Sequence, residues 1–138
     1  MILGKPHSYL LGNKIPEFCK SHWLLRLPLI IVFLQQGLSK FPVSSVDAES
    51  FALPILVWFF VAWGEVLAGV GITLGGLLEK KWFGDFITRI SGFIITSIML
   101  GVILIGDPEN ILDVVLYDQY HVMLFVGGLF FTLRGNRA

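Results

Sequence analysis

The feature that most constrains this chain is a run of 29 residues, 50–78, that contains only one charged side chain, Glu65. A helix of about 20 predominantly apolar residues is long enough to cross the hydrocarbon core of a bilayer. A second run, residues 90–106, has no charged residue over 17 positions. We therefore expect both runs to form membrane-spanning helices.

Two further segments, residues 23–41 and 114–133, are less purely apolar. They can also span a membrane if their polar side chains lie at the ends or face other helices. The sequence thus predicts an all-α integral membrane four-helix bundle, with helices at about residues 22–41, 50–78, 87–106 and 114–133. An interfacial arm over residues 1–21 precedes the bundle, and a tail over residues 135–138 follows it.

The composition agrees with a membrane environment and excludes other classes of protein. Hydrophobic residues make up 55% of the 138 residues and charged residues 14%, against about 45–50% and about 25% in average soluble domains. The formal net charge of zero argues against a nucleic-acid-binding protein. A single cysteine excludes a disulfide scaffold. The expected partner is the lipid bilayer, with other membrane-protein subunits as further partners.

Basic side chains are concentrated on one side of the predicted helices. Nine of the ten belong to this side, namely Lys5, Lys14, Lys20, Arg26, Lys80, Lys81, Arg89, Arg134 and Arg137. The other side has one lysine and six acids, namely Lys40, Asp47, Glu49, Asp107, Glu109, Asp113 and Asp118. The excess of basic residues on the cytoplasmic side of membrane proteins predicts that both termini are cytoplasmic. We expect a multi-pass protein of a bacterial inner membrane.

Glu65 lies near the middle of the second predicted helix, and therefore near the bilayer midplane. Gly69 and Gly76 lie on its face of the helix, and Gly71 and Gly75 form a GxxxG pattern on a neighbouring face. Small residues at such spacings allow a second helix to approach closely. Glu65 should therefore point into the bundle. It either holds helices together through a charge or hydrogen-bond partner, or it handles protons or binds a quinone.

Two basic residues lie on one face of the first predicted helix. Arg26 is about one turn inside the cytoplasmic boundary, where its long side chain can extend back to the interface. Alternatively, it turns inward and pairs with Glu65, because their axial separation is roughly 10 Å at 1.5 Å per residue. Lys40 lies at the outer boundary, where a lysine that extends toward water is the simplest interpretation.

Several polar side chains fall in the outer half of the predicted bundle. Gln36 lies one turn inside Lys40, and His121 has Tyr117 four positions before it. With Glu65 below them, these side chains are candidates for a small pocket that suits a quinone head group. No phosphate-binding loop, Ser–His–Asp set or HExxH motif occurs. We therefore expect no catalytic residue and no metal ligand.

The segments LLRLPLIIVFLQQGLSKF and WGEVLAGVGITLGGL resemble the DoxX-like family of small four-helix membrane proteins. The matching positions are Arg26, Gly37, Lys40, Glu65, Gly69, Gly75 and Gly76. This resemblance implies a four-helix fold and a redox-associated context. DoxD, a related membrane subunit of thiosulfate:quinone oxidoreductase, is similar in organisation and would make quinone the natural ligand.

Three functions are consistent with these observations. The first is a non-catalytic accessory subunit of a larger redox-associated membrane complex. The second is a quinone-interacting membrane subunit of an oxidoreductase, with Glu65 and Lys40 near the head group. The third is a small solute or proton transporter that uses Glu65 as carrier, although the chain shows no inverted repeat of the kind that many transporters contain.

Overall fold

A computed structural model describes residues 20–137, and every regular element in that part of the chain is an α-helix. In chain order the helices are α1 (Trp23–Ser39), α2 (Ser45–Ser50), α3 (Ile55–Leu77), α4 (Trp82–Ile105), α5 (Ile111–Tyr117) and α6 (Gln119–Arg134). The all-helical prediction is therefore confirmed for these residues. The arm predicted over residues 1–21 lies almost entirely outside the described part of the chain.

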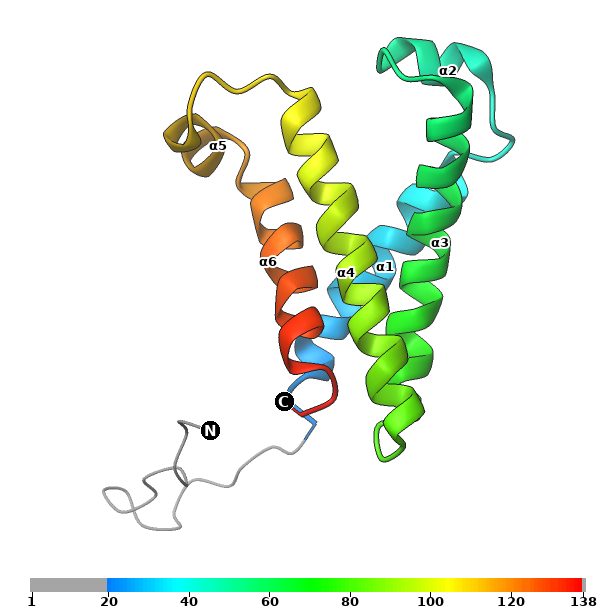
Figure 1. The fold of residues 1–138 in the computed structure, drawn as a ribbon, viewed down its shortest axis with the longest axis vertical. Coiled ribbons are helices and arrows are strands. Elements are labelled where there is room, and N and C mark those ends of the chain that lie inside the picture. The colour runs from blue at the N-terminus through cyan, green and yellow to red at the C-terminus, as the bar shows by residue number, and fades with distance from the viewer. Residues whose placement is uncertain (1–19, 138) are drawn as a thin grey trace.

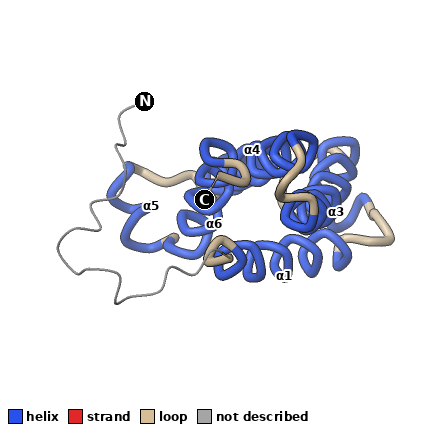
Figure 2. The backbone as a smooth tube through the Cα atoms, turned by 90° about the horizontal axis from the view of Figure 1, so that it is seen from below, coloured by secondary structure: helices blue, strands red, loops and turns tan. Residues whose placement is uncertain are grey.

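Four longer helices form the body of the molecule. Helix α4 packs against both α3 and α6, and α1 packs along α3, whereas α1 meets α6 at only a few positions. Seen along the bundle, α1, α3, α4 and α6 follow one another in a ring, and α5 lies to one side (Figure 2). Their buried apolar side chains form one core, made of Leu29, Phe33, Ala68, Ile72, Ile95, Met99, Leu124 and Phe131.

The two ends of the bundle differ in their loops. The short helices α2 and α5 lie at one end, and the α3–α4 loop lies at the other end with the carboxyl end of the chain (Figure 1). We call these the α2/α5 end and the loop end. The α2/α5 end contains acidic side chains, among them Asp47 and Glu49 of α2 and Asp113 of α5. Basic side chains such as Lys80, Lys81 and Arg134 gather at the loop end.

Two helices, α3 and α4, are long and apolar enough to cross a membrane, each with a mean hydropathy of 2.0. The pair α5 and α6 meets the same test when taken together, but the two helices meet at an angle of 100°. Helix α1 is apolar and shorter, with 17 residues. The described residues thus contain two such helices, or three if the bent pair counts as one span.

Two of the predicted helix boundaries need correction. The second predicted helix does not begin at residue 50, because α2 ends there and α3 begins only at Ile55. Pro54 is its N-cap, with an extended ψ of 145° that breaks the chain between the two helices. The third helix begins at Trp82 rather than near residue 87. Its first turns contain the Asp85–Arg89 ion pair, at a spacing of four residues that supports a helix.

The fourth predicted helix, residues 114–133, is broken at Asp118. The backbone of Asp118 leaves the helical region at φ −119° and ψ 46°, and α5 turns away from α6 by 100°. Asn110 begins α5 with a side-chain cap on the N–H of Asp113, so α5 starts as a separate helix. The break removes Tyr117 from the helix that contains His121.

The glycines of α3 lie where neighbouring helices come closest. A Cβ atom built on Gly69 would lie 2.8 Å from Leu34 of α1, and one on Gly76 would lie 2.8 Å from Trp23 of α1. A Cβ atom on Gly71 or Gly75 would instead collide with the hydroxyl groups of α4, those of Ser91 and Thr88 respectively. One face of α3 thus packs against α1 and another packs against α4, and only glycine allows helices to approach this closely.

Candidate functional site

A cavity of about 790 Å³ opens between α1, α3, α4 and α6 in the half of the bundle toward α2 and α5. Most of its wall is apolar, with Phe33, Trp58, Ile98, Met99 and Leu124 among the lining side chains. The polar side chains on the wall are few, namely Gln36, Lys40, Glu65, Ser97, Tyr120 and His121. A large apolar cavity with a few polar groups is typical of a site for a small ligand.

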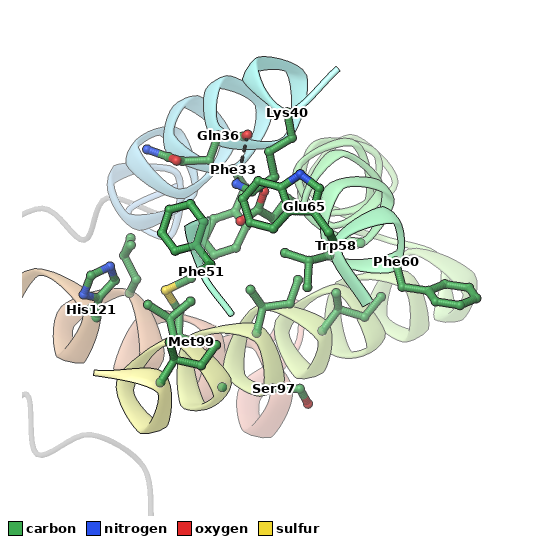
Figure 3. A pocket seen from close by; sticks show the side chains of 18 of the residues that line it. Phe33, Gln36, Lys40, Phe51, Trp58, Phe60, Glu65, Ser97, Met99 and His121 are labelled. Carbon is green, nitrogen blue, oxygen red and sulfur yellow. Dashed lines mark hydrogen bonds and ion pairs between the residues drawn. The ribbon is translucent and has the colours of Figure 1, made fainter. Parts of the chain in front are cut away.

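The strongest charges in the cavity wall belong to one ion pair. Nζ of Lys40 lies 2.7 Å from Oε2 of Glu65 and also donates to the backbone carbonyl of Gln36 at 3.2 Å. The side chains of Lys40 and Glu65 are only 12% and 5% exposed. Figure 3 shows this pair between α1 and α3 at the edge of the cavity.

The close crossing of α1 and α3 brings the two charges together. A Cβ atom on Gly37 would lie 2.6 Å from the Val66 side chain and 3.1 Å from Cβ of Glu65. Because Gly37 is three residues before Lys40, the lysine side chain extends along the crossing and reaches the carboxylate. The sequence places Lys40 at the outer boundary and in the candidate pocket, and in the structure it pairs directly with Glu65.

Trp58 forms another part of the cavity wall and carries an unpaired polar group. Nζ of Lys40 lies 5.2 Å from the centroid of the Trp58 ring, within the range of a cation–π interaction. Phe51 stacks on the same ring, with centroids 5.1 Å apart and an angle of 19°. The indole N–H of Trp58 is buried and has no hydrogen-bond partner. A buried donor without a partner costs free energy.

The structure brings together four of the five predicted pocket residues. Gln36, Lys40, Glu65 and His121 all line the cavity. Tyr117 does not, because the bend at Asp118 turns α5 away and leaves the tyrosine 84% exposed. Tyr120, in the first turn of α6, lines the cavity beside His121.

The predicted pair of Arg26 with Glu65 is not formed. Arg26 is fully buried, and its guanidinium donates to the carbonyl of Ile72 at 2.8 Å and to Nδ1 of His22 at 2.9 Å. It lies over the face of Phe131, 4.7 Å from the ring centroid. Since Ile72 is two turns along α3 from Glu65, the arginine belongs to the loop end of the bundle.

Asn136 completes this second polar cluster, and the sequence analysis placed it in the tail. Its Oδ1 atom accepts hydrogen bonds from Arg26 at 2.5 Å and from Thr88 at 2.8 Å, and its Nδ2 atom donates to the carbonyl of Gly75 at 2.9 Å. The backbone N–H of Asn136 donates to Asp85 at 2.7 Å. The end of the chain thus connects α1, α3 and α4 and closes the loop end. The one sequence signal was an asparagine after a helix-ending glycine.

Within residues 20–137, no group of three His, Cys, Asp or Glu side chains is placed to hold a metal ion. The chain was also compared with protein-family models, curated proteins and solved structures, and none of the three comparisons finds a match.

Proposed function

We propose that this chain is an integral membrane protein that binds a quinone-class ligand in the cavity between α1, α3, α4 and α6. The observation that carries the proposal is the buried Lys40–Glu65 ion pair at the edge of a large, mostly apolar cavity. Buried charges cost free energy unless they are paired. A buried ion pair that faces a cavity is therefore expected where the pair also binds a ligand.

The chemistry of the wall favours a ligand with an apolar body and a carbonyl-bearing ring. The volume of about 790 Å³ lies within the range of small-molecule sites. Lys40 supplies a charged donor for a carbonyl oxygen, and the Trp58 ring supplies an aromatic surface beside it. The rest of the wall, with Phe33, Met99 and Leu124, suits an isoprenoid-substituted ring that arrives from the bilayer.

The proposal includes four membrane crossings, made by α1, α3, α4 and α6, with both termini in the cytoplasm. The separation of basic side chains at the loop end from acidic ones at the α2/α5 end supports this orientation. A bacterial inner membrane is the proposed location. The resemblance to the DoxX-like family supports a role as a subunit of a redox-associated membrane complex.

The experiment is purification in mild detergent, followed by extraction and mass spectrometry of bound small molecules and by titration with decylubiquinone. We expect bound quinone in the wild-type preparation and saturable binding of the added quinone. Lys40→Met should weaken that binding by roughly tenfold or more, since a hydrogen bond from a charged group is lost. The matched control is Lys80→Met, which removes an exposed lysine from the α3–α4 loop.

A second variant keeps the test informative if Lys40→Met folds poorly. Trp58→Phe keeps a smaller aromatic ring in the wall and reduces the aromatic surface beside Lys40, so it should bind decylubiquinone several-fold more weakly because ring contacts with the ligand are lost. The proposal is overturned if the folded wild-type protein binds no quinone. It is also overturned if both variants bind decylubiquinone as tightly as the wild type does.

A further inference from the structure

A second polar pair, His121 with Asp118, contributes its histidine to the cavity wall. His121 lines the cavity from the first turn of α6, and its Nδ1 atom lies 2.5 Å from Oδ1 of Asp118. Figure 3 shows His121 on one side of the cavity and the Lys40–Glu65 pair on another, with Met99 and Phe51 also on the wall. The polar groups of the cavity are thus gathered mainly at two places.

The bend between α5 and α6 creates this second pair. Asp118 ends α5 and is the N-cap of α6, so its carboxylate reaches the side chain three residues later. Tyr120 packs edge-on against the His121 ring, with centroids 5.2 Å apart and an angle of 72°. The imidazole is therefore held by a carboxylate and an aromatic ring. A carboxylate on Nδ1 fixes which nitrogen carries the proton and leaves Nε2 for another partner.

Each pair contains both a hydrogen-bond donor and an acceptor. In the first pair, Lys40 can donate to a carbonyl oxygen and Glu65 can accept from a hydroxyl group. In the second pair, Nε2 of His121 accepts from a hydroxyl group when the ring is neutral and donates to a carbonyl when the ring is protonated. The two pairs can therefore hold an oxygen substituent in its oxidised or its reduced form.

We infer that the cavity takes a six-membered ring with oxygens at the 1 and 4 positions, one at the Lys40–Glu65 pair and the other at His121, which Asp118 holds in place. This inference rests on the proposed function and makes it more specific, because it assigns a recognition group to each oxygen. A ligand with a single ring oxygen would use only one pair. His121 then determines specificity for the two-oxygen ring.

The test compares two probes of similar size in the full-length protein in lipid nanodiscs. One probe is 1,4-naphthoquinone, which has both oxygens, and the other is 1-tetralone, which has one. We expect the wild type to bind 1,4-naphthoquinone about tenfold more tightly, as one additional buried hydrogen bond predicts. His121→Phe should remove this preference and leave the affinity for 1-tetralone unchanged. Lys40→Met should weaken the binding of both probes.

Two further variants distinguish a specific loss of ligand recognition from a general effect on folding. Asp118→Asn should reduce the preference for the two-oxygen probe while the imidazole remains in place. Tyr117→Phe, four positions before His121 and outside the cavity, should behave as the wild type does. If wild-type protein binds neither probe, the proposed function itself fails. If it binds 1,4-naphthoquinone and His121→Phe keeps the same preference, only the two-point recognition is overturned.

Discussion

At the scale of single residues, the molecule separates its polar side chains into two clusters within an apolar interior. Lys40 and Glu65 form the cluster beside the cavity, and Arg26, with Asn136 and Thr88, forms the cluster at the loop end. The cluster of Arg26 is packed against protein on all sides, since the arginine is fully buried. Of these two clusters, only the Lys40–Glu65 pair lines the cavity.

The Lys40–Glu65 pair should show strong energetic coupling. Lys40→Met and Glu65→Gln should each lower the free energy of unfolding in detergent by about 3 kcal/mol, because each leaves a buried charge without its partner. The double variant should lose much less than the sum of the two losses. Thermal or denaturant unfolding of all four proteins measures this coupling. Additive losses would show that the two charges do not depend on each other.

His22 should make the stability of the loop end depend on pH. Burial, together with the neighbouring Arg26 guanidinium, lowers the pKa of His22 below 6.5. The unfolded chain then binds a proton more readily than the folded one, so stability is complete above pH 6.5 and decreases as the pH falls below it. Protonation would also remove the lone pair of Nδ1 that accepts from Arg26 at 2.9 Å.

The measurement is the midpoint of thermal unfolding between pH 7.5 and pH 5. The wild type should lose more stability over this range than His22→Gln, which cannot take up a proton at this position. Equal losses in the two proteins would exclude His22 as the source of the pH dependence.

Four polar pocket residues could be predicted from the sequence because each interrupts an apolar segment. Glu65 is the clearest case, as the only charge in residues 50–78. The partner of Glu65 could not be predicted in the same way. Axial spacing allowed Arg26 to reach it, but the crossing at Gly37 sets the relative height of α1 and α3. That crossing depends on side-chain packing between two helices. The spacing of residues along one helix gives no information about this packing.

At the scale of elements, the glycines of α3 set how closely its neighbours approach, whereas Gly101 of α4 faces open space. A Cβ atom on Gly75 would collide with the Thr88 hydroxyl and lie 3.0 Å from the carbonyl oxygen of Gly84. A Cβ atom on Gly101 would have no atom within 4 Å. The same substitution should therefore have opposite effects at the two positions.

Gly75→Ala should destabilise the protein, since α4 must move away from α3, by roughly 1–3 kcal/mol as for other overpacked cores. Gly101→Ala should leave stability unchanged or raise it by up to about 1 kcal/mol, because alanine favours a helix more than glycine does. Unfolding of the two variants under identical detergent conditions tests the contrast. A stable Gly75→Ala protein would contradict the close packing of α3 and α4 described above.

The existence of the long helices was predictable from apolar runs, but their interruptions were only partly so. The break at Asp118 was missed because residues 114–133 are apolar on both sides of it. Asp107–Pro108 ends the preceding apolar run, but nothing in the local pattern requires a second helix after Tyr117. The consequence was the assignment of Tyr117 to the pocket, where Tyr120 lies instead.

At the scale of the whole molecule, the charges at the two ends define the proposed orientation. The test uses a variant that lacks the single cysteine. Lys80→Cys and Glu109→Cys, made separately in this background, each add one thiol in an exposed loop, before and after α4 respectively. A membrane-impermeant maleimide should label the cysteine at position 109 in intact cells and the one at position 80 only after lysis. The reverse pattern would contradict the cytoplasmic termini. Labelling of both in intact cells would contradict a membrane-spanning α4.

The central claim is that the cavity itself binds the ligand, and filling the cavity tests it most directly. Gly101 lines the cavity, and Gly101→Phe adds a large side chain where nothing lies within 4 Å of the new Cβ atom. Ile90→Phe adds a comparable ring at a 44% exposed position of the same helix and serves as the control. The measurement is the equilibrium affinity for decylubiquinone of the wild type and both variants in nanodiscs. Gly101→Phe should unfold at the wild-type temperature or above and lose binding at least tenfold, whereas Ile90→Phe should bind normally. Unchanged affinity in a folded Gly101→Phe protein would contradict the account.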